Sequence, residues 1–334
     1  MKTKIFFVFA IALTVFSACK QTPSKYIYNE GFVYGTMYHF IYESPQGKDL
    51  QEDVKEKLDE YNSMFSTYDP ESVIAKINNN KNVKLTPEFI TCFQKAMEIS
   101  EITSGAFDIT AGPLVNAWGF GPEDKEKMTQ ERVDSLLQII GYKKLKLENG
   151  KIVKENPQMK LDMSAIAKGY TCDLIGEFLA SKGCENYMID IGGEIVTKGK
   201  NEKGKKWGIG ISRPEENAFF ASSDYDAVVE LSGHALATSG NYRNFYVEDG
   251  KKYAHTIDPK TGYPVQHSIL SSTVLADNCM TADAYATAFM VLGLDKGIEI
   301  ADKVPEIKVY FIYADENGEN QIYMSKDFEQ FLRK

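Results

Sequence analysis

The chain has 334 residues, of which 43% are hydrophobic, 12% aromatic and 25% charged, a composition typical of a globular protein with a substantial core. Its formal net charge of -9 disfavours nucleic acid as a partner, because proteins that bind DNA or RNA present basic surfaces to the phosphates. The five cysteines show neither C-x-x-C pairing nor a histidine spacing suited to zinc, which excludes the common zinc modules. We expect the four that follow residue 19 to be buried free thiols.

The first 18 residues have the pattern of a secretory signal peptide. Lys2 and Lys4 precede an apolar run that is too short for a stable membrane span, and small residues stand directly before Cys19. This predicts a lipobox, although Phe16 stands where leucine is usual. We therefore expect residues 1–18 to be removed and the protein to be exported and anchored through acylated Cys19 to a bacterial membrane, facing the periplasm. Ordinary secretion and an uncleaved anchor are the alternatives.

The next segment, residues 19–30, is polar and without period, which predicts a tether to a single domain over residues 31–334. The first half of that domain favours helices. Apolar residues recur every three or four positions around Leu58, and Thr86-Pro87 is a helix cap followed by proline at the first helical position. The expected helices begin near Leu50 and Thr86 and cover residues 129–140, 165–180 and 281–292.

The second half favours strands, because its segments are rich in β-branched and aromatic residues. Asp249-Gly250 and Asn317-Gly318 predict tight hairpin turns. Earlier in the chain, the alternating aromatic segment 26–42 also predicts a strand. Helices first and mostly antiparallel strands later indicate an α+β fold with mixed, mostly antiparallel sheets flanked by helices. The strands expected in the second half are 187–191, 207–212, 227–231, 244–247, 269–276 and 307–313.

Within the first half, residues 104–122 hold so many glycines and aromatic residues that we expect an ordered loop without a regular element. Ordered irregular loops often carry function, and an aromatic lining suits a flat ring system. A loop that merely packs on the core would have the same composition.

Two predicted helix starts favour a phosphate ligand and a cation. Asp162 or Ser164 can cap a helix whose free N–H groups, with the charge of Lys168 in its first turn, suit a phosphate. Asp283 and Thr287 are four residues apart, so they lie on one face of a helix. One carboxylate and one hydroxyl are too few for a calcium or zinc cage, but Mg²⁺ commonly takes one or two protein oxygens and leaves the rest to phosphates and water. Ordinary helix capping is the alternative explanation.

The most informative segment begins at His255 and has the pattern His-x-x-Asp-Pro-x-Thr-Gly, which looks like an exposed polar turn. Taken with the segments before and after it, in this order, it resembles the ApbE family, the FAD:protein FMN transferases. The resemblance extends from Gly35 to about Gly293. The segments that carry it are Gly35–Tyr38, Phe65–Asp69, residues 104–122, Leu161–Tyr170, Asp190–Glu194, His255–Pro264 and Ala282–Ala288.

The resemblance implies a two-lobed α+β fold that holds FAD between its lobes. It also implies a reaction in which a threonine or serine hydroxyl of an acceptor flavoprotein attacks the FMN phosphorus of FAD while AMP leaves, with Mg²⁺ neutralising charge on the diphosphate. Family acceptors are membrane-associated redox subunits or domains. With water as the acceptor, the same site would be an FAD pyrophosphatase. A flavin-binding lipoprotein without turnover is a third alternative.

The motifs of the resemblance also assign residues. They place FAD contacts at Met37 and Tyr68, at Ala106, Phe107 and Asp108 on the adenine or ribose side, and at Asp162, Lys168 and Ile257. They place the metal on the Ala165 carbonyl, Asp283 and Thr287. His255 is the expected proton-transfer group.

Overall fold

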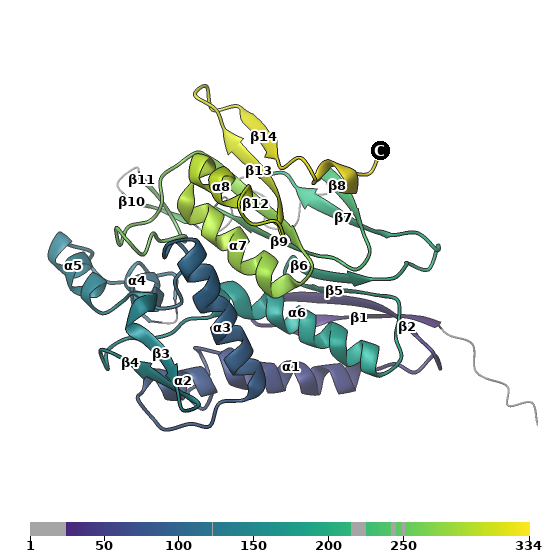
Figure 1. Ribbon diagram of the computed structural model, residues 1–334, viewed down its shortest axis with the longest axis horizontal. Coiled ribbons are helices and arrows are strands. Elements are labelled where there is room, and N and C mark those ends of the chain that lie inside the picture. Colours follow the sequence, from purple (N-terminus) through teal and green to yellow (C-terminus); the bar gives the residue numbers. More distant parts are fainter. Residues whose placement is uncertain (1–24, 122, 215–224, 242–244, 249–250) are drawn as a thin grey trace, which may run out of the picture.

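The computed structural model describes residues 25–121, 123–214, 225–241, 245–248 and 251–334, whose arrangement is shown in Figure 1. The predicted signal peptide, Cys19 and the Asp249-Gly250 turn lie outside these residues. Within the described ranges, no helix is both long and apolar enough to cross a bilayer. Strand β1 (Lys25–Val33) already begins at Lys25, so the tether predicted over residues 19–30 is too long and its last six residues belong to the domain.

The strands form one large sheet and three hairpins. They are β1, β2 (Thr36–Ser44), β3 (Leu145–Glu148), β4 (Lys151–Lys154), β5 (Tyr187–Ile191), β6 (Glu194–Lys198), β7 (Trp207–Ser212), β8 (Tyr225–Leu231), β9 (Ala235–Gly240), β10 (Phe245–Glu248), β11 (Lys251–Ala254), β12 (Ile269–Ala276), β13 (Lys308–Ala314) and β14 (Asn320–Met324). The large sheet has eight strands in the order β1-β2-β5-β6-β9-β12-β13-β14, and all neighbours are antiparallel. The predicted α+β class is confirmed. The placement of FAD between two lobes stays a prediction.

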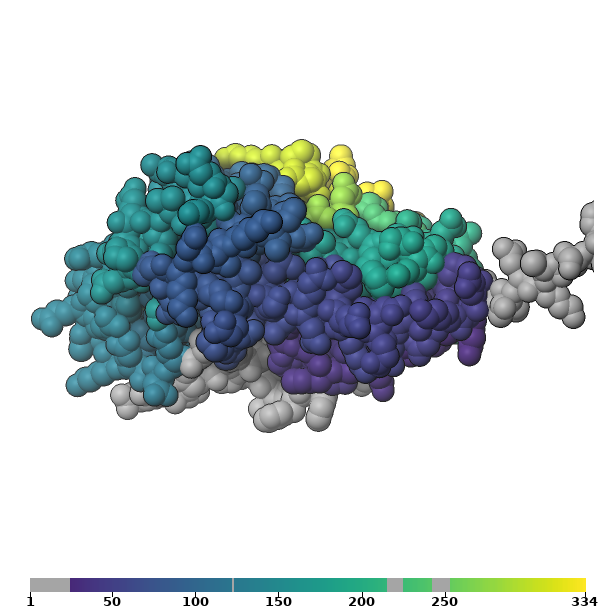
Figure 2. Space-filling view, turned by 90° about the horizontal axis from the view of Figure 1, so that it is seen from below, coloured from purple at the N-terminus to yellow at the C-terminus, as the bar shows by residue number. Residues whose placement is uncertain are grey.

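Helices cover one face of the large sheet (Figure 1). The helices of the described residues are α1 (Gln51–Phe65), α2 (Val73–Asn78), α3 (Pro87–Ile102), α4 (Gly112–Ala117), α5 (Gln130–Gln138), α6 (Ser164–Ser181), α7 (Cys279–Leu292) and α8 (Leu294–Ala301), with 3-10 turns η1 (Tyr142–Lys144) and η2 (Glu329–Phe331). Helices α6 and α7 contact the sheet, and α1 and α3 pack on these two helices. In Figure 2 the side seen from below is formed largely by the first half of the chain, coloured purple to teal.

The sheet has an apolar cluster on each face, because side chains alternate along a strand. On β12, Val274 faces the helices and belongs to the main core, whereas Leu275 faces the other way and packs with β7 and β8. A third, smaller cluster around Trp118 lies beneath the segment that begins at His255. All four cysteines of the described residues are buried and free, as predicted.

Several predicted elements agree with the structure. Helix α1 buries Leu58 and its periodic neighbours, and Thr86 caps α3 by accepting a hydrogen bond from the Phe89 N–H. Helix α5 begins directly after its capping residue Thr129. The strands predicted at 187–191, 207–212 and 269–276 match β5, β7 and β12 residue for residue.

Other predictions are wrong. The single strand over 26–42 is a hairpin, because Tyr34 and Gly35 take φ angles of 51° and 76° and turn the chain between β1 and β2. Residues 104–122 include a regular element, the short helix α4. Helix α7 begins earlier than predicted and is capped by Asn278. Strand β9 was not predicted, because Ala-Leu-Ala-Thr-Ser-Gly holds few β-branched residues and no aromatic one.

Candidate functional site

Helices α6 and α7 cross in contact at Gly169. A Cβ atom added there would overlap the carbonyl oxygen of Cys279 and would lie 2.7 Å from the Cβ atom of Asp283, so the crossing requires glycine. The Gly169 N–H donates to Asp283 Oδ2 at 3.0 Å. In a regular helix this N–H points at the carbonyl four residues back, which is that of Ala165. The Asp283 carboxylate therefore approaches the same turn of α6 that carries the Ala165 carbonyl.

The third predicted metal ligand follows one helical turn after Asp283. Thr287 Oγ1 lies 3.2 Å from the Oγ of Ser239, which belongs to strand β9. Asp283 is buried, and Thr287 is half-buried. No group of three or more His, Cys, Asp and Glu side chains is arranged for a metal in the part of the chain that the structure describes. The predicted set does not need such a group, because two of its three oxygens come from a backbone carbonyl and a hydroxyl.

The charges beside this crossing are unbalanced. Lys168 Nζ lies 2.6 Å from Glu194 Oε2 in an ion pair, and this oxygen receives no directed hydrogen bond from the described residues. Burial opposes the charge of Lys168, but the carboxylates of Glu194 and Asp283 outweigh it and raise the pKa of the ammonium. Burial raises the pKa of both carboxylic acids, while Lys168 opposes that shift.

One ammonium thus faces two buried carboxylates. When both are ionised, one negative charge stays without compensation in a region where unpaired charge is strongly unfavourable. An added cation would offset it. The donors are oxygens, which Mg²⁺ prefers, so the residues present fit the predicted metal. Lys168 is the fifth residue of α6, and its charge therefore lies in the second turn and not in the first as predicted.

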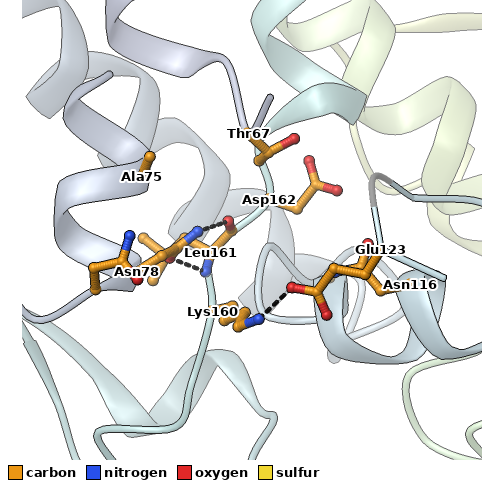
Figure 3. Close-up of a pocket in the computed structure, with 10 residues that line it drawn as sticks. Thr67, Ala75, Asn78, Asn116, Glu123, Lys160, Leu161 and Asp162 are labelled. Carbon is orange, nitrogen blue, oxygen red and sulfur yellow. Dashed lines mark hydrogen bonds and ion pairs between the residues drawn. The ribbon is translucent and has the colours of Figure 1, made fainter. Parts of the chain in front are cut away.

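A polar pocket of about 130 Å³ opens next to the start of α6. Figure 3 shows Thr67 and Asp162 close together in its wall, with Lys160 paired to Glu123 nearby. Asp162 Oδ1 accepts a hydrogen bond from the Ser164 N–H at 2.8 Å, so Asp162 satisfies an N–H of the first turn, as predicted, although Met163 is the capping residue by position. The pocket is smaller than those that enclose whole ligands. A pocket of this volume can hold only one part of an elongated ligand.

Two predicted FAD contacts are available to a ligand. The Met37 side chain is 46% exposed and that of Tyr68 is 74% exposed, although both are large and apolar or aromatic. Tyr68 directly follows Thr67 in the pocket wall. The Met37 carbonyl accepts a hydrogen bond from the Gly192 N–H at 3.0 Å, which places Met37 at the turn that leads into Glu194. Tyr68 therefore lies beside the pocket, and Met37 lies beside the turn that leads to Glu194 at the crossing.

Three further predicted contacts have buried side chains, and a fourth, Asp108, is half-buried. Ala106, Phe107 and Ile257 pack among apolar residues. Asp108 accepts hydrogen bonds from the N–H and hydroxyl of Thr110 at 2.8 and 2.6 Å and from the Tyr142 N–H at 2.9 Å. Burial raises the pKa of Asp108 in spite of these bonds. A ligand contact from the three buried residues would use the backbone, and all four contacts stay predictions.

The segment after His255 is tied down on both sides. Trp118 Nε1 donates to the carbonyl of Gly262 at 2.8 Å, and Thr256 Oγ1 donates to Asn241 Oδ1 at 2.6 Å. Thr256 and several residues after it are buried, so this turn is less exposed than predicted. The His255 ring is half-buried, and its centroid lies 6.3 Å from that of Phe120. Because Asn241 directly follows β9, one strand end contacts both the His255 segment and, through Ser239, the α7 site.

Comparison with known proteins shows the family of this chain. The family model described as ApbE family matches residues 34–311. The chain belongs to the ApbE family. Curated relatives named FAD:protein FMN transferase include that of Vibrio cholerae, 36% identical over 332 residues and 97% of each chain, and that of Haemophilus influenzae, 38% identical over 333 residues and 95% of each chain.

Solved ApbE structures have the same fold. The flavin transferase ApbE from Vibrio cholerae superposes with a TM-score of 0.83 at 36% identity and covers 93% of this chain and 100% of its own. The apo form of the Pseudomonas stutzeri flavinyl transferase ApbE superposes with a TM-score of 0.82 at 29% identity, covering 92% and 97%. These comparisons support the predicted α+β fold of an ApbE protein along nearly the whole chain.

Sequence reasoning missed three residues that shape this ApbE site. Glu194 carries the second buried carboxylate, and its signal was present in the Gly-Gly-Glu strand end at residues 192–194. Gly169 fixes the helix crossing, and its signal would have been a glycine inside a helical pattern. Ser239 contacts Thr287 from a strand that was not predicted, so no signal pointed to it.

Proposed function

We propose that this protein is an FAD:protein FMN transferase. It binds FAD, and a threonine or serine hydroxyl of an acceptor flavoprotein attacks the FMN phosphorus. A new oxygen–phosphorus bond forms to FMN, the bond between that phosphorus and the oxygen of AMP breaks, and the hydroxyl proton passes to a base. The observation that carries the proposal is the oxygen-lined, negatively charged crossing of α6 and α7 in a chain of the ApbE family.

The residues at the crossing have distinct roles in this proposal. The Ala165 carbonyl, Asp283 and Thr287 hold Mg²⁺, which when bound supplies positive charge that neutralises the diphosphate and the departing AMP. Lys168, paired with Glu194, donates a hydrogen bond to FAD once the cation offsets the charge of the two carboxylates. Met37 and Tyr68 contribute exposed side chains to the flavin, and Asp162 contributes the free side of its carboxylate in the pocket.

His255 takes the proton of the attacking hydroxyl. A positioned base contributes about 10²–10⁴-fold to such reactions. This role is supported by the Trp118 and Thr256 hydrogen bonds, which hold the segment after His255 to α4 and to the end of β9.

One experiment tests the transfer. The purified protein is incubated with FAD and Mg²⁺, with and without a flavoprotein domain that carries an exposed threonine, and AMP and protein-bound FMN are measured by mass spectrometry. We expect AMP release only with the acceptor, together with an FMN mass on a threonine. Full-rate AMP release without the acceptor would identify an FAD pyrophosphatase. FAD that stays intact with a competent acceptor would identify a flavin-binding protein without turnover.

We also propose that the protein is exported and carries a lipid anchor on Cys19. The support is the sequence pattern of residues 1–19 alone. A membrane-bound position would bring the enzyme to membrane-associated acceptors. Mass spectrometry of the protein from membranes should find an acylated N-terminal Cys19, and a Cys19→Ala variant should leave the membrane fraction. An unmodified, soluble chain that still starts at residue 1 would contradict export.

A further inference from the structure

A serine on strand β9 contacts the side chain of Thr287. Ser239 Oγ lies 3.2 Å from Thr287 Oγ1, and the pair joins the large sheet to α7. Both side chains are half-buried, so the pair borders the open side of the site and is not sealed in the core. Such a pair can affect what Thr287 offers to a ligand.

A threonine that binds a cation must direct an oxygen lone pair toward it and its hydroxyl proton elsewhere. Within a helix, the common acceptor for that proton is the carbonyl four residues back, which for Thr287 is the carbonyl of Asp283. Ser239 Oγ is an acceptor outside the helix. A hydrogen bond to Ser239 therefore selects between two directions of the Thr287 hydroxyl.

We propose that Ser239 is a positioning residue for the cation site. It accepts the hydroxyl proton of Thr287 and thereby keeps the Thr287 oxygen available to a hard divalent cation such as Mg²⁺. The inference rests on the proposed function, which assigns Thr287 as a ligand. Residues that form a hydrogen bond to a metal ligand typically contribute about 10–100-fold to metal affinity.

The position of Ser239 explains why the test needs a mild substitution. Asn241, two residues later, holds the His255 segment through Thr256, so a change that displaces the end of β9 would disturb both parts of the site. Ser239→Ala removes one hydroxyl and keeps the backbone. Ser239→Thr keeps the hydroxyl on a residue that strands favour.

Strand β12 supplies a matched control. Ser272 is the cross-strand partner of Ser239, and its side chain lies on the same face of the sheet. Ser272 is fully buried, and its Oγ has no hydrogen-bond partner among the described residues. Ser272→Ala therefore removes a neighbouring hydroxyl that does not bond to Thr287.

The experiment measures the binding of Mn²⁺, a paramagnetic probe for Mg²⁺ sites, to the full chain without FAD. The electron paramagnetic resonance signal of the free ion reports how much Mn²⁺ stays unbound. We expect Ser239→Ala to weaken Mn²⁺ binding about tenfold. Ser239→Thr should stay within about twofold of the wild type, and Ser272→Ala should equal it. In a Thr287→Val background, Ser239→Ala should have no further effect, because the contact is already lost.

Three results would overturn the inference in different ways. Wild-type affinity in a folded Ser239→Ala protein, checked by its unfolding temperature, would reject the role of Ser239 and leave the proposed function intact. A wild type that binds no Mn²⁺ would reject the inference together with the metal assignment. An equal loss on Ser239→Ala with and without Thr287 would also overturn it, because the effect would not pass through that hydroxyl.

Discussion

The glycine at the helix crossing gives the sharpest prediction. In Gly169→Ala, the new Cβ meets the Cys279 carbonyl and lies 2.7 Å from the Asp283 Cβ atom, whereas carbon atoms in contact are about 3.5–4.0 Å apart. Backbone and Cβ atoms cannot rotate away, so α6 and α7 must separate by roughly 1 Å. Such overpacking costs about 1–3 kcal/mol, against a gain of about 1 kcal/mol in helix propensity.

Gly176→Ala in the same helix is the control. Its Cβ would be 3.2 Å from the Tyr187 ring, a side chain that can shift by a few tenths of an ångström. The free energies of unfolding of the two variants, from urea titrations, should differ by about 1–3 kcal/mol, with Gly169→Ala less stable. Gly169→Ala should also lose transfer activity by about 100-fold, because an error of 1 Å in a site has that effect. Equal stability and activity of the two variants would refute the close-contact argument.

Three other predictions concern the metal, the base and the pH. Mg²⁺ should raise the unfolding temperature of the wild type, and a chelator should remove that rise. Asp283→Ala should abolish both this rise and the transfer activity. An Asp283→Ala variant that still responds to Mg²⁺ would contradict the role of Asp283 as a metal ligand. His255→Ala should bind FAD normally in a fluorescence titration but slow transfer by about 10²–10⁴-fold, and a normal rate would exclude it as the base. Burial raises the pKa of Asp173 to about 7, although the N–H groups of Cys279 and Met280 donate to it. Since the folded protein then holds this proton more tightly than the unfolded chain, the contribution of Asp173 to stability is greatest below about pH 4 and is lost as the pH rises through about 7, by at most about 4 kcal/mol. Asp173→Asn should lack this loss in thermal unfolding measured across the same range, and an unchanged profile would show that Asp173 does not titrate there.

Local signals in the sequence were enough for the helices with clear ends. Thr86-Pro87 marks the start of α3, and the four-residue spacing of Asp283 and Thr287 places both on one face of α7. The α+β class followed from the order of the elements. Short elements were missed, because β9 and α4 are too short or too poor in typical residues to have a period of their own.

The partners of the site residues could not be predicted in the same way. The contact between Lys168 and Glu194 joins α6 to β6, and that between Thr287 and Ser239 joins α7 to β9. Neither follows from local periodicity, because both depend on how the sheet orders its strands. The family resemblance named ligand residues for the same chain. It did not indicate which of them, such as Phe107, would have a side chain buried in the core.

The close crossing of α6 and α7 at Gly169 also explains the excess negative charge at the site. Without a side chain at Gly169, the two helices approach until the Gly169 N–H reaches Asp283, and this approach also brings the Asp283 carboxylate near Lys168, which already pairs with Glu194. The packing that stabilises the helix pair thus concentrates two carboxylates around one ammonium. The oxygen-lined place proposed for a cation is then a result of close helix packing, and in our proposal the contact from Ser239 orients Thr287, the last of the predicted ligands.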